Sequence, residues 1–226
     1  MRRASSARRL IRIRIDRSGL LYKVRGGEPK LPSLPTNQMQ FLARTEVRDL
    51  ILSICSLYVS KPESLEVVAN EAKDGSTLFL VRGDPQDDSR LIGRDGSHII
   101  SLNFLVQQVG VEQKSVFNLK LLTSDVRVPA YRGKVNSMDY NPQTAREVVE
   151  SWLFALGVEK LRVSVGPGEP GNSLSFSLNV EIEDRAKAKS LTVPPKGSNL
   201  FIVDALGTLI RAIGKHNGVR LELNLT

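Results

Sequence analysis

Apolar and polar positions along this 226-residue chain recur at spacings that predict alternating helices and strands. Within residues 45–123 a helix is expected to begin after Thr45, whose side chain suits an N-cap. A short helix from Pro85 leads into a turn at Gly93, and a further helix runs from that turn to a stop at Gly110. Alternation predicts strands at 65–69, 77–81 and 116–122, the first two joined by a turn at 73–75.

A similar succession follows from residue 141. Asn141 and Pro142 predict a helix start and Gly157 its end. Strands are expected at 161–165 and 173–183, joined by a turn at 166–172, then a polar stretch from Asp184, a helix ending at Gly214 and a strand at 219–225.

The two stretches read as an internal repeat. Gly93–Gly110 and Gly197–Gly214 span 18 residues each, and apolar positions coincide within them. Leu102, Leu105 and Val109 correspond to Leu206, Leu209 and Ile213. The order helix, strand, strand, helix, helix, strand is therefore expected twice in an α+β protein. The alternative is a second domain of unrelated α+β fold, built from common hairpins and helices.

The first 38 residues have a different character. Residues 1–9 are polar and basic, which predicts disorder in the free chain. Residues 10–15 and 20–24 alternate around a Ser18–Gly19 turn and predict a β-hairpin, and three prolines mark 26–35 as a linker. The expected parts are an arm and linker at 1–38, a domain at 42–124, a connection at 125–140 and a domain at 141–226.

The net charge of +8 belongs to the arm. Residues 1–25 carry nine basic side chains against one acidic residue, whereas the remainder holds 23 basic and 23 acidic side chains. A basic arm favours contacts with nucleic-acid phosphates. The alternative is an organelle transit peptide, although residues 10–15 have the period of a strand. The expected phosphate contacts are Arg2, Arg3, Arg8, Arg9, Arg12, Arg14 and Arg17.

The stretch Leu91-Ile92-Gly93-Arg94-Asp95-Gly96, followed by Ser97-His98-Ile99-Ile100, offers the most specific chemistry. Two glycines three positions apart let an anionic backbone approach the main chain. The turn opens a helix, whose first N–H groups and positive dipole end favour a phosphate. The alternative is a plain helix-capping turn.

This turn, in the order helix, strand, strand, helix, helix, strand, resembles the type II KH domain. Residues 91–106 are also similar to the KH domain of the Jag family of bacterial RNA-binding proteins, and the resemblance covers about residues 45–123. It implies a fold that grips single-stranded RNA or DNA at the turn. The implied binding residues are Gly93, Arg94, Gly96, Ser97 and His98, with Leu91, Ile92 and Ile99 flooring the groove.

Some positions depart from that pattern. Asp95 lies inside the turn, and Asp87 and Asp88 precede it, so modest affinity is expected. His98 has a second interpretation as an exposed bystander. The second repeat has Leu200 where the first has a glycine, after Pro194 and Pro195, and keeps only Lys196 as a secondary phosphate contact.

Other function classes find little support. Cys55 is the only cysteine and is expected in the core, and His98 and His216 are the only histidines, so neither a disulfide framework nor a zinc site is expected. No nucleophile-and-base spacing indicates an enzyme, and we expect no cofactor and no metal. No apolar run reaches the roughly 18 residues of a membrane span, which predicts a soluble, cytoplasmic protein, or an organelle matrix protein if the arm is a transit peptide.

The sequence thus predicts a non-enzymatic protein that binds single-stranded RNA, with single-stranded DNA as a second ligand. It is expected to work with protein partners in a ribonucleoprotein, transcription or translation complex. Aromatic residues form only 5% of the chain, so extensive base stacking is not expected. The alternative is a structural or assembly subunit whose KH-like units mainly contact proteins.

Overall fold

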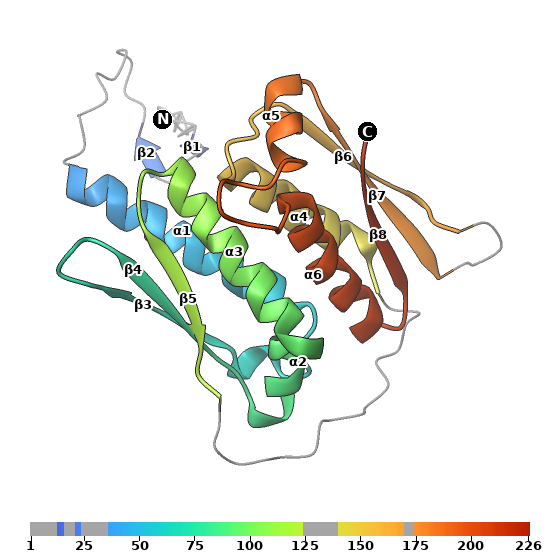
Figure 1. Ribbon diagram of the computed structural model, residues 1–226, viewed down its shortest axis with the longest axis horizontal. Helices are drawn as coiled ribbons and strands as arrows, with labels where there is room; N and C mark the ends of the chain where they lie inside the picture. The colour runs from blue at the N-terminus through green and yellow to red at the C-terminus, as the bar shows by residue number, and fades with distance from the viewer. Residues whose placement is uncertain (1–12, 16–20, 24–35, 124–139, 170–173) are drawn as a thin grey trace, which may run out of the picture. The chain divides into compact units, whose positions relative to one another are not determined.

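The computed structural model of the chain describes residues 13–15, 21–23, 36–123, 140–169 and 174–226 (Figure 1). The chain divides into two compact units, Met1–Gln38 and Met39–Thr226. The first contains β1 (Ile13–Ile15) and β2 (Leu21–Lys23), paired antiparallel. The hairpin is therefore present over these residues, whereas the expected disorder at 1–9 and the Ser18–Gly19 turn lie outside the described residues.

The second unit begins with helix, strand, strand, helix, helix, strand. Strands β3 and β4 are antiparallel, β4 and β5 are parallel, and β4 is the central strand. Short 3₁₀ turns at 62–64, 85–87 and 94–96 connect some of the elements. The elements are α1 (Thr36–Ser56), β3 (Glu66–Glu71), β4 (Thr77–Arg82), α2 (Asp88–Ile92), α3 (Ser97–Glu112) and β5 (Phe117–Leu121).

The rest of this unit repeats the same order and the same sheet topology. Strands β6 and β7 are antiparallel, β7 and β8 are parallel, and β7 is the central strand. The protein is therefore a mixed α+β molecule. The elements are α4 (Pro142–Ala155), β6 (Leu161–Pro167), β7 (Ser175–Ile182), α5 (Arg185–Leu191), α6 (Ile202–His216) and β8 (Arg220–Leu225).

Each sheet is covered on one face by helices. In Figure 1, α1 and α3 lie against the first sheet and α4 and α6 against the second. The apolar positions expected to coincide in the repeats are all buried: Leu102, Leu105 and Val109 in α3, and Leu206, Leu209 and Ile213 in α6. These helices also pack against each other, so one buried apolar cluster includes residues of both halves.

Gly110 and Gly214 lie inside helices and do not end them as predicted. A Cβ on Gly110 would lie 2.8 Å from the Ser115 carbonyl oxygen, and a Cβ on Gly214 would lie 2.8 Å from that of Val219. These glycines let the returning chain cross the helix closely on its way to β5 or β8. The same close approach at corresponding positions is a structural mark of the repeat.

Three further predictions are wrong in detail. Helix α1 starts at Thr36, so Thr45 lies within it and is not its N-cap. The polar stretch after Asp184 forms α5, because the Asp184 carboxylate accepts hydrogen bonds from the Ala186 and Lys187 amides. The strand predicted at 173–183 is too long. In the structure β7 covers Ser175–Ile182, and Leu174, which precedes it, is 39% exposed.

Several boundaries match the prediction. Asn141 caps α4 by accepting a hydrogen bond from the Gln143 amide at 3.0 Å, and Gly157 follows the helix. Cys55 is fully buried, as expected. The expected irregular connection lies almost wholly at 124–139, outside the described residues. Every helix of the described segments is too short or too polar to cross a membrane.

Candidate nucleic-acid interface

The Gly93–Gly96 turn joins α2 to α3 through left-handed backbone. Gly93 has φ +76° and Gly96 has φ +77°, values that glycine adopts without steric cost. Asp95 adopts φ +53° and ψ +30°, a conformation that aspartate tolerates better than most residues. The turn therefore requires the residue types found there, whether or not it binds a ligand.

The amides of both glycines are engaged inside the turn. The Gly93 N–H donates to the Ser89 carbonyl at 3.0 Å, and the Gly96 N–H donates to the Gly93 carbonyl at 3.3 Å. Phosphate binding by these two N–H groups does not fit this geometry. The segment 94–96 is not a helix start, because the backbone at Asp95 is left-handed.

The side chains at the tip of the turn stand free in solvent. The Arg94 side chain is 96% exposed and that of Asp95 is 93% exposed. Their charged groups lie 3.8 Å apart, and an ion pair so exposed contributes little. Arg94 can therefore turn toward a phosphate at small cost. Ser97 follows as the first residue of α3, with its amide bonded to the Arg94 carbonyl.

His98 supports the turn from beneath and is not an exposed bystander. Its Nδ1–H donates to the Arg90 carbonyl at 2.6 Å, and its ring meets Tyr58 edge-on at 5.7 Å. A Cβ on Gly93 would lie 2.5 Å from Cγ of His98, so the ring and the glycine fit each other. Burial lowers the pKa of His98 below its ordinary value, so the imidazole is neutral near pH 7.

The apolar residues around the turn divide between core and surface. Leu91 is 2% exposed and belongs to the core, so it cannot floor a groove. Ile92 and Ile99 are half-buried. Ile100 is 57% exposed and lies beside Gly96. A base could therefore contact Ile92, Ile99 or Ile100, but not Leu91.

A cavity of about 330 Å³ lies beside the turn, and residues of both repeats line it. It is lined by three cations and two imidazoles, without a carboxylate. The first repeat contributes Tyr58, Ser89, Arg90, Gly93, Arg94 and His98, and the end of α6 contributes Ala212, Lys215 and His216. Sequence reasoning missed Lys215 and His216, and its only available signal was their position in the last turn of a helix.

Asp87 balances the charge of one of the three cations that line this cavity, although its own carboxylate does not reach the lining. Its carboxylate is buried and accepts hydrogen bonds from the Ser60 and Lys61 amides at 2.9 and 3.1 Å. It also pairs with Arg90 at 2.9 Å, which holds the guanidinium against the cavity wall. Burial and the nearby Arg90 charge lower the pKa of His216, and Asp87 only partly offsets them.

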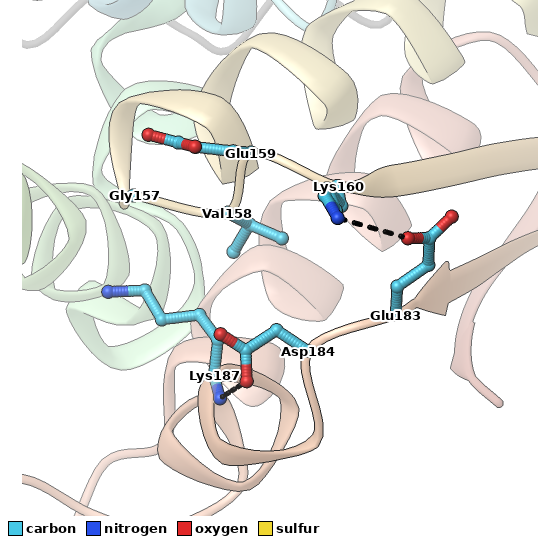
Figure 2. A pocket seen from close by; sticks show the side chains of 7 residues that line it. All are labelled: Gly157, Val158, Glu159, Lys160, Glu183, Asp184 and Lys187. Atoms are coloured by element: carbon cyan, nitrogen blue, oxygen red, sulfur yellow. Dashed lines mark hydrogen bonds and ion pairs between the residues drawn. The ribbon is translucent and has the colours of Figure 1, made fainter.

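A second cavity, of about 420 Å³, has a different electrostatic character (Figure 2). Its lining holds three carboxylates and two lysines, so its formal charge is negative. Lys160 lies 3.8 Å from Glu183, and Lys187 is paired with Glu112 of α3. A polyanion would gain little from such a surface. The lining residues are Gly157, Val158, Glu159, Lys160, Glu183, Asp184 and Lys187.

The turn of the second repeat lacks the geometry of the first. Gly197 has φ +85°, but α6 begins only at Ile202, so no helix start faces the turn. Leu200 is half-buried and packs against the core. Lys196 is exposed and lines neither cavity. Of the arm, only Arg14 lies in a described strand, and the other predicted arginine contacts lie outside the described residues.

No protein-family model and no curated protein matches the chain. In the described part, His, Cys, Asp and Glu side chains do not gather in groups of three or more that could hold a metal ion. Function must therefore be inferred from the residues around the turn and their geometry.

Proposed function

We propose that this protein is a non-enzymatic single-stranded RNA-binding protein with two type II KH-like units in tandem. The first unit holds the sugar-phosphate backbone at the Gly93–Gly96 turn. The observation that carries the proposal is the exposed, left-handed turn beside a cavity whose lining includes three cations and no carboxylate. Single-stranded DNA, which has the same phosphodiester backbone, is a second ligand.

The chemistry of the turn supports a phosphodiester ligand. Gly96 has no side chain, and the nearest atom to the place of its Cβ belongs to Ile100 at 3.4 Å, so a ligand can approach the main chain there. The Arg94 side chain provides a charge-assisted donor at the tip. Element order and sheet topology, found twice, agree with the KH-like arrangement expected from the sequence.

The basic arm extends this binding. The arm belongs to the same chain as the turn, so once the turn holds RNA the arginines of the arm meet neighbouring phosphates at high effective concentration. A weak turn and a charged arm together give useful affinity although neither binds tightly alone. We place the protein in a ribonucleoprotein, transcription or translation complex, where RNA and protein partners meet.

A second candidate function is a structural subunit that uses these units for protein contacts. The outer face of the first sheet favours it, because Val68 and Leu78 are exposed there by 41% and 37%, and Leu122, directly after β5, is exposed by 41%. Apolar side chains gathered on one face are typical of interaction surfaces. In that case the turn has no role in RNA binding.

The variant Arg94→Asp tests the turn. It reverses a charge on a side chain that is 96% exposed, so we expect the variant to fold normally. We expect affinity for a short unstructured oligouridine, measured by fluorescence anisotropy, to fall about tenfold. Lys73→Asp makes the same charge change in the exposed β3–β4 turn and serves as the control. Equal affinities for the two variants would refute the proposal and favour the structural subunit.

Substitution of Gly93 would be a poorer test, since any side chain there meets His98. The folding of each variant can be checked with Cys55. This thiol is fully buried, and burial raises its pKa to about 12. It should resist a thiol reagent in every folded variant.

A further inference from the structure

Helices α3 and α6 run in opposite directions where the two repeats meet. His98 at the start of α3 and Gly93 just before it line one cavity together with Lys215 and His216 at the end of α6. The end of α3 in turn adjoins α5, where Glu112 pairs with Lys187. Each repeat thus places the last turn of its long helix beside the short helix of the other.

These two junctions are related by the repeat but differ in charge. At the α3 end, the carboxylate of Glu112 neutralises Lys187. At the α6 end, Lys215 is exposed, and no carboxylate of the described residues lies within ion-pair distance of it. Only the junction beside the Gly93–Gly96 turn therefore keeps a net positive charge.

We propose that a phosphate of the bound RNA occupies the cavity between this turn and the end of α6, held by Lys215 and His216 of the second repeat together with Arg94. This inference rests on the proposed function and adds a role for the second repeat, which supplies one wall of the binding site. The other junction does not bind RNA, so each chain has one such site.

The electrostatic field at the end of α6 favours an anion only because of the side chains that line the cavity there. The C-terminal end of a helix carries partial negative charge, which repels phosphate. Lys215 and His216 lie in that last turn. The Lys215 charge opposes the dipole, and the His216 imidazole can donate a hydrogen bond. Arg90 lines the same wall, but its charge is balanced by its ion pair with Asp87, so the net positive charge there comes from Lys215 and the exposed Arg94. The cavity volume of about 330 Å³ is at the lower end of the range for small-molecule sites.

The test is Lys215→Glu in the full-length protein, with the same oligouridine. We expect an affinity loss of about tenfold, comparable to that of Arg94→Asp. Lys189→Glu, at an exposed position on α5 that lines neither cavity, should lose much less. Lys215→Arg, which keeps the charge, should bind like the unchanged protein.

A double-mutant cycle then asks whether the two residues hold the same phosphate. If they do, Arg94→Asp combined with Lys215→Glu weakens binding by less than the product of the single effects, because both substitutions disrupt one shared site. Suppose that Lys215→Glu lowers the affinity no more than Lys189→Glu does, while Arg94→Asp still lowers it. That result overturns this inference and leaves the proposed function standing. Full affinity in all of these variants overturns both.

Discussion

The two histidines of the cavity have opposing effects on stability and on binding. Burial lowers the pKa of both His98 and His216. In the folded protein they therefore bind protons less readily than in the unfolded chain, whose histidines titrate near 6.5. The free energy of unfolding is unaffected above that pH and falls as the pH drops below it. On the inference above, a phosphate beside His216 should favour its imidazolium form and so oppose this shift of its pKa.

Acidification should therefore tighten RNA binding. Between about pH 7.5 and about pH 5.5, affinity for oligouridine should rise while the ligand-free protein loses stability. Anisotropy titrations and chemical denaturation across this range measure the two effects. His216→Gln should flatten the binding profile. Part of the pH dependence should remain, because His98 also lines the site, whereas Arg90 and Lys215 keep their charge and Asp87 acts from behind Arg90. A profile that His216→Gln leaves unchanged would exclude His216 as a phosphate contact.

Sequence reasoning located only half of this cavity. The spacing of Gly93 and Gly96 is enough to predict the turn from the sequence alone. It could not reveal that His98 packs beneath Gly93, since a histidine near a turn gives no sign of its burial. Lys215 and His216 could not be assigned at all, because they reach the site through the packing of α6, far along the chain.

At the scale of elements, the two long helices depend on close backbone crossings. The Cβ of an alanine at position 110 would lie 2.8 Å from the carbonyl oxygen of Ser115. The Cβ of an alanine at position 214 would lie 2.8 Å from the carbonyl oxygen of Val219. Backbone atoms in β5, β8 and their connections cannot move aside without disturbing a sheet. Overpacking of this kind typically costs about 1–3 kcal/mol.

We therefore expect Gly110→Ala and Gly214→Ala each to lower the free energy of unfolding by about 1–3 kcal/mol, as measured by urea denaturation. Gly207→Ala is a control on the same helix as Gly214. Its Cβ would meet only the flexible end of Arg211, at 3.3 Å, and alanine favours helix by up to about 1 kcal/mol. Gly207→Ala should therefore be neutral or stabilising. A similar change in all three variants would contradict the role assigned to the crossings.

The same elements show what local patterns can and cannot predict. Strands and amphipathic helices were found because their apolar period is visible in the sequence. Helix α5 was missed because Arg185–Leu191 has no apolar stripe, and only the cap at Asp184 could have indicated it. Gly110 and Gly214 were interpreted as helix ends, because a glycine required by a distant crossing looks the same as a C-cap.

At the scale of the whole chain, the sequence predicts the repeat but not how the two repeats pack against each other. Matching glycine spans and apolar positions predicted two similar units, and each has the same sheet topology. Which helices pack together depends on surface shape and charge that one sequence does not display. The contrast between Glu112 and Lys215 at the two junctions becomes meaningful only once that packing is known.

The distribution of charge leads to the last prediction, which concerns the arm. Removal of residues 1–25 takes away nine basic side chains and leaves a chain with equal numbers of basic and acidic residues. For a single strand, the slope of log affinity against log salt becomes shallower by about 0.7 for every phosphate that the arm no longer neutralises. We expect the truncated protein to bind oligouridine more weakly at low salt and with a much shallower salt dependence, measured by anisotropy at several salt concentrations.

A matched variant separates the charge of the arm from its length. Replacement of Arg2, Arg3, Arg8 and Arg9 by glutamine keeps the chain length and should reproduce part of the flattening. Arg94→Asp in the truncated protein should still weaken binding, because the turn acts without the arm. If truncation leaves both the affinity and the salt slope unchanged, the arm does not contact RNA, and its arginines fit a transit peptide better.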